Sequence, residues 1–263
     1  MADRGTQALM LTILAAVFAF LYVPIAVLVG LSFNDGGLPT AWTGFSTRWY
    51  RSLMSNGDIL MAARNSLIVA LVSTVIATAL GTALAIGVEI RRRRGRLVET
   101  LILAPMVIPD IVLAIALLSL FSLLNLTMGL HTIIAAHVVF NLAFVCAVVR
   151  ARLRSFDWAI VEASADLGAR PATTYRRIVL PVLAPAVIAG ALLSFTLSVD
   201  EFIIAFFTAG PGRASITLPM QIYAMIRFGV TPEINALATL VMGLSVVALA
   251  LAQRLGRGRL PGQ

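Results

Sequence analysis

Lysine is absent from this 263-residue chain, and charged residues of every kind make up only 12% of it. A soluble domain carries about 25% charged residues, so the composition excludes an ordinary soluble fold. The lack of lysine also excludes a P-loop, because the Gly-x-x-x-x-Gly-Lys-Ser/Thr pattern needs one. The chain is therefore not expected to hydrolyse ATP by the usual route.

Cysteine and histidine are nearly absent as well. Cys146 is the single cysteine, which excludes an intrachain disulfide, and its apolar neighbours favour a small packing role. His137 lies four residues before Asn141 without a second cluster of ligands, so hydrogen bonding between helices is expected there and a metal site is not. No Ser/His/Asp or Cys/His arrangement indicates a catalytic residue.

What the chain has in excess is apolar sequence: 60% of its residues are hydrophobic and its mean hydropathy is +0.96. A helix that crosses a bilayer needs about 20 predominantly apolar residues. The first such run, Ala8–Phe33, is too long for the apolar region of a signal peptide, so we expect it to be retained. Six transmembrane helices are predicted, over residues 8–33, 65–88, 100–124, 130–150, 182–208 and 233–253.

Arginine supplies all 20 basic residues and a formal net charge of +8. The arginines lie between the apolar runs, which suits lipid headgroups better than nucleic acid. Fifteen of them fall in segments that are inside if the N-terminus is inside, including the tight turn Arg91–Arg96, and the other five fall outside. The positive-inside rule therefore predicts an N-in, C-in topology.

The segments between the helices differ in kind. The outer segment 34–64 carries Trp42, Trp49 and Tyr50, which suit the membrane interface. In the second outer segment, 209–232, the run Thr231-Pro232-Glu233 is typical of a helix start and opens the sixth helix. Prolines are expected to kink or start the third and fifth helices, at Pro105, Pro109, Pro181 and Pro185.

The one long inside segment, 151–181, is predicted to form a helix–turn–helix. Residues 157–167 have helical composition, and the helix is expected to end at Gly168. Pro171 then opens a second short helix that extends to about Val179. Composition alone is also compatible with an ordinary amphipathic connector.

Specific residues of this segment favour a particular role. Glu162-Ala163-Ser164, followed by Gly168 and then Ile178-x-Leu180-Pro181, resembles the EAA signature of ABC importer permeases, with every spacing matched and Ser164 in place of the second alanine. The resemblance implies that the segment docks on a separate ATPase subunit. The coupling residues it implies are Glu162, Ala163, Ser164, Asp166 and Gly168.

Over nearly its full length the chain is similar to the spermidine/putrescine (PotC-type) permease family of type I importers. The residues that carry the similarity are Ser32-Phe33-Asn34, Pro109 to Val112, Thr196 to Glu201, Thr208 to Pro211, Ser215 to Val230 and Pro232 to Thr239. It implies an all-α membrane fold, with a five-helix core and an additional N-terminal helix in one permease domain, 1–263. It also implies a bacterial cytoplasmic (inner) membrane location.

The partners implied by this similarity are a paralogous permease subunit, two ATPase subunits and an extracytoplasmic substrate-binding protein. ATP and Mg would be bound by the ATPase, and this chain would bind no cofactor. In such an importer the loaded receptor docks outside, ATP closes the ATPase pair, and the cavity alternates between the two sides of the membrane.

The charges within the apolar helices give an independent indication of the cargo. A charge at mid-bilayer costs about 2.5–3.5 kcal/mol on insertion scales, so such residues usually face a cavity. Asp110, Asp200 and Glu201 are all acidic, which suits a cationic cargo such as a polyamine. Each could instead form a structural hydrogen bond between helices.

Helical spacing ranks these acids. Steps of four and three residues place Ser194, Ser198 and Glu201 on one small and polar stripe, which continues to Ala205 and Thr208. Asp200 lies about 100° away from that stripe. Glu201 is therefore our first candidate for a residue that lines the pathway, followed by Asp200 and Asp110. Ser194 and Ser198 are expected to line it beside them.

Three alternatives stay open. The cargo could be another small solute, such as an amino acid derivative, a sugar or an iron chelate. The chain could be a secondary transporter or channel driven by ion gradients, which inverted repeats would favour, although none is visible. An intramembrane enzyme would need a catalytic pair within the helices, and the sequence shows none.

Overall fold

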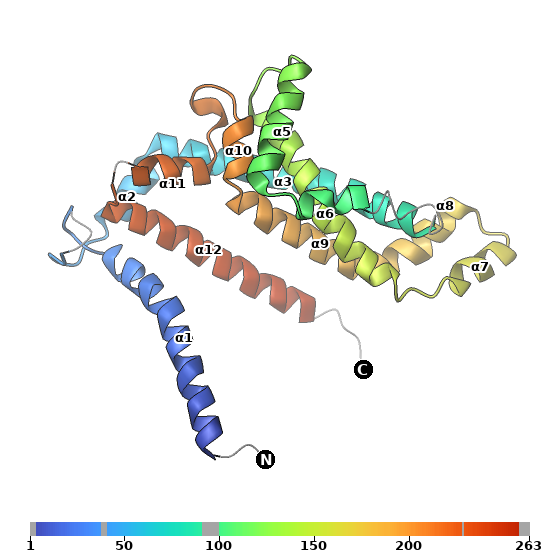
Figure 1. Cartoon of the computed structure of the whole chain (residues 1–263), viewed down its shortest axis with the longest axis horizontal. Helices are drawn as coiled ribbons and strands as arrows, with labels where there is room; N and C mark the ends of the chain where they lie inside the picture. The colour runs from blue at the N-terminus through green and yellow to red at the C-terminus, as the bar shows by residue number, and fades with distance from the viewer. Residues whose placement is uncertain (1–3, 38–40, 91–99, 228, 258–263) are drawn as a thin grey trace. The chain divides into compact units, whose positions relative to one another are not determined.

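A computed structural model describes residues 4–37, 41–90, 100–227 and 229–257, and these are folded mainly as helices (Figure 1). Within those ranges the nearest approach to a strand is one isolated antiparallel bridge between Asn34 and Phe45. The all-α fold class is thereby confirmed. The predicted turn Arg91–Arg96 and the terminal Arg259 lie outside the described residues.

The chain divides into two compact units, one formed by residues 61–221 and the other by residues 1–60 with 222–263. Whether residues 1–263 act as one permease domain stays a prediction.

The smaller unit contains α1 (Arg4–Leu31), α2 (Arg48–Ser55) and α12 (Pro232–Arg257). The short α2 joins the other two helices. The Tyr50 hydroxyl lies 2.6 Å from that of Ser32 after the end of α1, and the Ser52 hydroxyl donates to the Glu233 carboxylate at 3.0 Å. The predicted helix start at Pro232 is confirmed.

The segment before α2 is folded around Asn34, which is fully buried. Its side-chain oxygen accepts from the Thr43 N–H at 2.9 Å, its amide donates to the Ala41 carbonyl at 2.7 Å, and the Trp49 indole donates to the Asn34 carbonyl at 2.8 Å. Of the aromatic residues expected at the membrane interface, Trp49 therefore serves this internal network, whereas Trp42 is exposed.

The larger unit is built on α3 (Gly57–Ile90), α6 (Leu130–Leu153) and α9 (Leu180–Asp200), which lie side by side (Figure 1). Small residues allow the close approach. A Cβ at Gly81 would lie 2.9 Å from the Val145 side chain, and one at Gly190 would lie 3.4 Å from it. Because lipid tails are as apolar as the helices themselves, such tight packing is what holds spanning helices together.

The third predicted span, 100–124, is broken. Its first part, Thr100–Met106, and α5 (Asp110–Leu123) meet at an angle of 114°. Pro109 lacks an N–H and disfavours helical geometry at Ile108, which explains the break. Asp110 consequently stands at the start of a helix.

The fifth predicted span, 182–208, is also interrupted. The helix α9 ends at Asp200, Glu201 has an extended backbone, and α10 (Ile203–Thr208) starts afterwards. The prediction of one continuous helical stripe through Thr208 is therefore wrong beyond Asp200.

In the described residues four helices are long and apolar enough to cross a membrane, or five if the bent pair is one span. They include α1, α3 and α6, and the fourth extends from Pro171 to Asp200. The apolar part of α12, Pro232–Val246, is shorter. A multi-pass membrane protein is confirmed, whereas six spans and the N-in, C-in topology stay predictions.

At the predicted outer end of the larger unit, the segment that follows α10 is tightly attached. Asn65 donates from its amide to the carbonyls of Ala214 and Ile216 at 3.1 and 2.9 Å. Gly210 packs on the backbone of Met128, where an added Cβ would lie 2.2 Å from the carbonyl oxygen. No side chain fits at Gly210 without displacing backbone.

Candidate functional site

The segment with the EAA-like residues contains α7 (Ala159–Asp166), a turn, and α8 (Pro171–Thr174). Glu162, Ala163 and Asp166 are exposed. Gly168 has φ = +77°, and a Cβ there would meet no atom within 4 Å. The turn thus needs glycine for its left-handed backbone and not for lack of space.

Ser164 occupies a different environment from its neighbours. Its side chain is buried, and its hydroxyl lies 2.8 Å from that of Thr174. This hydrogen bond ties α7 to α8, so Ser164 holds the two arms of the segment together in this structure.

The second helix of the segment, predicted from Pro171 to about Val179, differs from that prediction. After α8 the chain passes through a π-helical turn, Tyr175–Val179, directly into α9. One helical body of 30 residues therefore extends from Pro171 to Asp200, and a separate helix that ends near Val179 does not form. Phe156, Trp158 and Tyr175 pack on the core of α6 and α9 and join the segment to the spanning helices.

Asp110 and Glu201 stand at the breaks of two interrupted spans. Asp110 begins α5, Glu201 precedes α10, and α5 packs on α10. Both side chains are partly buried. Asp200 is exposed at the end of α9, so it stands apart from the starts of α5 and α10.

The Glu201 carboxylate also has a local function. It accepts a hydrogen bond from the Ile204 N–H and so caps the N-terminus of α10. Asp110 likewise stands in the first turn of α5. Because the N-terminus of a helix carries partial positive charge, each helix stabilises the carboxylate beside it. Two acidic side chains thus stand at the starts of two helices that pack on each other.

The two predicted pathway serines face neighbouring helices. Ser198 is buried and its hydroxyl lies 2.7 Å from His137 Nδ1 and 3.1 Å from the Ser73 hydroxyl. Ser194 is buried and donates to the Thr74 hydroxyl at 3.4 Å. The predicted interhelical bonding of His137 is thus present, whereas the Asn141 side chain is buried without a hydrogen-bond partner among the described residues.

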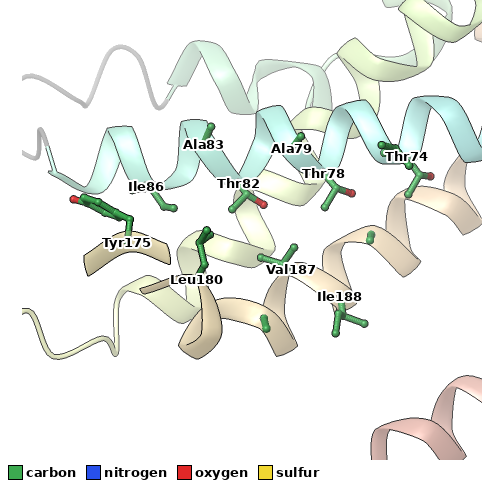
Figure 2. A pocket seen from close by; sticks show the side chains of 13 residues that line it. Thr74, Thr78, Ala79, Thr82, Ala83, Ile86, Tyr175, Leu180, Val187 and Ile188 are labelled. Carbon is green, nitrogen blue, oxygen red and sulfur yellow. The ribbon is translucent and has the colours of Figure 1, made fainter. Parts of the chain in front are cut away.

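A groove of about 760 Å³ lies between α3 and α9. Figure 2 shows Thr74, Thr78 and Thr82 along one side of it, with Val187 and Ile188 opposite. Its walls are largely apolar, and no carboxylate lines it. Neither Asp110 nor Glu201 lines the groove.

Two features were missed by the sequence argument. Glu89 at the end of α3 is buried and pairs with Arg150 of α6 at 3.9 Å. Its position directly before the run of arginines was the available signal. Leu167, next to Gly168, is 88% exposed, and an apolar side chain in that turn signals a contact surface.

Comparison with known proteins places this geometry in a family. Residues 77–259 match the family model described as "Binding-protein-dependent transport system inner membrane component". The chain is 42% identical over 250 residues to "Spermidine/putrescine transport system permease protein PotC" of Escherichia coli strain K12, covering 95% of this chain and 94% of that protein. It is 44% identical over 241 residues to "Putrescine transport system permease protein PotI" of the same strain, covering 89% and 85%.

Solved structures share the fold at low sequence identity. A chain of a bacterial ABC transporter that imports the acidic polysaccharide alginate matches with a TM-score of 0.77 and 14% identity, covering 97% of this chain and 98% of that chain. A chain of the inward-facing MetNI methionine ABC transporter matches with a TM-score of 0.63 and 19% identity, covering 76% and 95%. At these identities the likeness establishes the fold alone.

Proposed function

This chain belongs to the family of binding-protein-dependent transport system inner membrane components, and from that membership we propose that it is a permease subunit of an ATP-driven polyamine importer. Its relatives at 42% and 44% identity are named as spermidine/putrescine and putrescine permeases. The observation that carries the cargo assignment is that two acidic residues, Asp110 and Glu201, stand at the breaks of two spans whose helices α5 and α10 pack on each other, since polyamines are cationic and carboxylates attract a cation.

In this proposal the permease forms half of a translocation pathway. A paralogous permease supplies the other half, two ATPase subunits bind ATP and Mg, and an extracytoplasmic binding protein delivers the cargo. The cell location is the bacterial inner membrane. Glu201 and Asp110 contact the cation, whereas Asp200 stands apart from them and Ser194 and Ser198 bond neighbouring helices.

Movement of the ATPase subunits is transmitted to the pathway through residues 151–181. The exposed side chains of Glu162, Ala163 and Asp166 meet the ATPase. The hydrogen bond between Ser164 and Thr174 holds α7 on α8, and the turn at Gly168 connects the two helices. Since the chain has no lysine and hence no P-loop, ATP hydrolysis belongs to another polypeptide.

The test is uptake of labelled spermidine and putrescine by proteoliposomes that contain the complete complex and its binding protein. Uptake is expected to require ATP inside and to cease with an ATPase subunit that cannot hydrolyse it. Uptake that persists with the inactive ATPase would establish an ion-coupled transporter instead. ATPase stimulation by an amino acid derivative, a sugar or an iron chelate, and not by polyamines, would reassign the cargo.

Substitution of Gly168 by valine is expected to lower receptor-stimulated ATP hydrolysis about fivefold or more. Left-handed backbone costs roughly 1–2 kcal/mol for an ordinary L-residue and more for a β-branched one. Asparagine tolerates that backbone, so Gly168→Asn is the matched control and is expected to keep at least half of the stimulation.

Glu162→Ala should also reduce stimulation, by removing a charged contact. Full stimulation in both Gly168→Val and Glu162→Ala would exclude a docking role.

A further inference from the structure

Three helices of the larger unit meet at one hydroxyl group. Ser198, in the last turn of α9, bonds His137 of α6 and Ser73 of α3 at 2.7 and 3.1 Å. All three side chains are at least 97% buried. No other residue of α9 is bonded by its side chain to two other helices within the described chain.

The bonds of this cluster have a consistent direction. The Ser73 hydroxyl donates to the Ala70 carbonyl at 3.4 Å, so its oxygen is free to accept from Ser198. Ser198 in turn accepts from His137 if the imidazole proton is on Nδ1. This order satisfies every donor and leaves only an acceptor, Nε2, without a partner. The reverse order would bury an N–H without an acceptor, which costs more.

The cluster lies directly before the break that carries Glu201. Only Val199 and Asp200 separate Ser198 from Glu201, and α9 ends at Asp200. On the far side of α10, the Thr208 carbonyl accepts from Thr132 of α6 at 2.7 Å. Both ends of the segment 198–208 are therefore attached to α6, at His137 and Thr132, and the glutamate lies between the attachments.

We propose that His137 is a positioning residue for cargo recognition: through Ser198 it fixes the end of α9, so that the Glu201 carboxylate is held in place at the break between α9 and α10. The inference rests on the proposed role of Glu201 in the pathway. It assigns His137 a function in transport that packing of the helices alone would not require.

Two amide substitutions at His137 separate these roles. Asparagine places its amide where Nδ1 lies and can still donate to Ser198, whereas glutamine places its amide near Nε2 and leaves Ser198 without that partner. In the complete complex His137→Gln is expected to lower the initial rate of spermidine uptake about tenfold, as for a lost buried hydrogen bond. His137→Asn is expected to retain at least half of the rate. Thr196→Ala serves as a control on α9, because Thr196 is exposed and bonds only within its own helix.

The double variant His137→Gln with Glu201→Gln decides whether His137 acts through Glu201. If it does, the double variant is as impaired as Glu201→Gln alone, because the group being positioned is already lost. If the two losses multiply, or if His137→Asn and His137→Gln are equally impaired, His137 is structural only and the proposal is wrong. Rates are compared per amount of assembled complex, measured by co-purification of the subunits.

The same measurements keep the two hypotheses apart. Normal uptake by Glu201→Gln would refute the pathway role itself. An impaired Glu201→Gln with a normal His137→Gln would refute the positioning role alone.

Discussion

Polyamine uptake is expected to fall roughly thirtyfold when Glu201 is replaced by glutamine, while assembly of the complex stays intact. Loss of a hydrogen bond to a charged group costs about 2 kcal/mol, which corresponds to that factor. The glutamine oxygen can still accept from the Ile204 N–H, so the cap of α10 is preserved. The measurement is the initial uptake rate in proteoliposomes, with subunit co-purification to report assembly.

Asp200→Asn is the matched control, since it removes a neighbouring carboxylate that is exposed and not capping a helix. Its effect should be less than threefold. Asp110→Asn should impair uptake more than Asp200→Asn, because Asp110 is partly buried and begins the helix that packs on α10. An assembled Glu201→Gln complex with normal uptake would remove Glu201 from the pathway.

The largest loss of stability is expected at Gly210, although the change is a single methyl group. In Gly210→Ala the new Cβ would lie 2.2 Å from the Met128 carbonyl oxygen, and backbone on both sides must move. Overpacking costs typically 1–3 kcal/mol, and a clash with backbone belongs at the upper limit, about 3 kcal/mol. The apparent Tm of the purified complex should fall by about 8 °C.

Gly87→Ala makes the same change in α3, where a Cβ would meet nothing within 4 Å. Alanine is the better helix former by about 1 kcal/mol, so this variant should melt at or above the temperature of the parent. Equal melting temperatures for Gly210→Ala and Gly87→Ala would show that the outer segment is not fixed to the α5–α6 turn.

The helices of this protein could be predicted because hydropathy sums over about 20 residues, and a membrane span is a property of that sum. The breaks could not be located in the same way. Two or three residues, such as Val107 to Pro109 or Glu201 and Phe202, hardly change the average of an apolar window. Prolines signalled the first break, while the second depends on one carboxylate that bonds backbone instead of pointing along the helical stripe.

Within the candidate site, residue type was more informative than periodicity. The acidic character of Asp110 and Glu201 was visible in the sequence, and so was the left-handed turn at Gly168. Their position at the starts of two helices that pack on each other was not, because it depends on how two broken spans pack. Likewise the burial of Ser164 depends on Thr174, ten residues away, and the burial of Glu89 depends on Arg150 on another helix.

The unbroken helix from Pro171 to Asp200 has a mechanical consequence. Thirty residues at about 1.5 Å each make a rod of about 45 Å. One end belongs to the segment proposed to meet the ATPase, and the other end adjoins Glu201. If the rod tilts by about 5° around its base, its far end moves by about 4 Å. The protein therefore contains a lever long enough for a small rotation at the ATPase to separate or join a carboxylate and its cation.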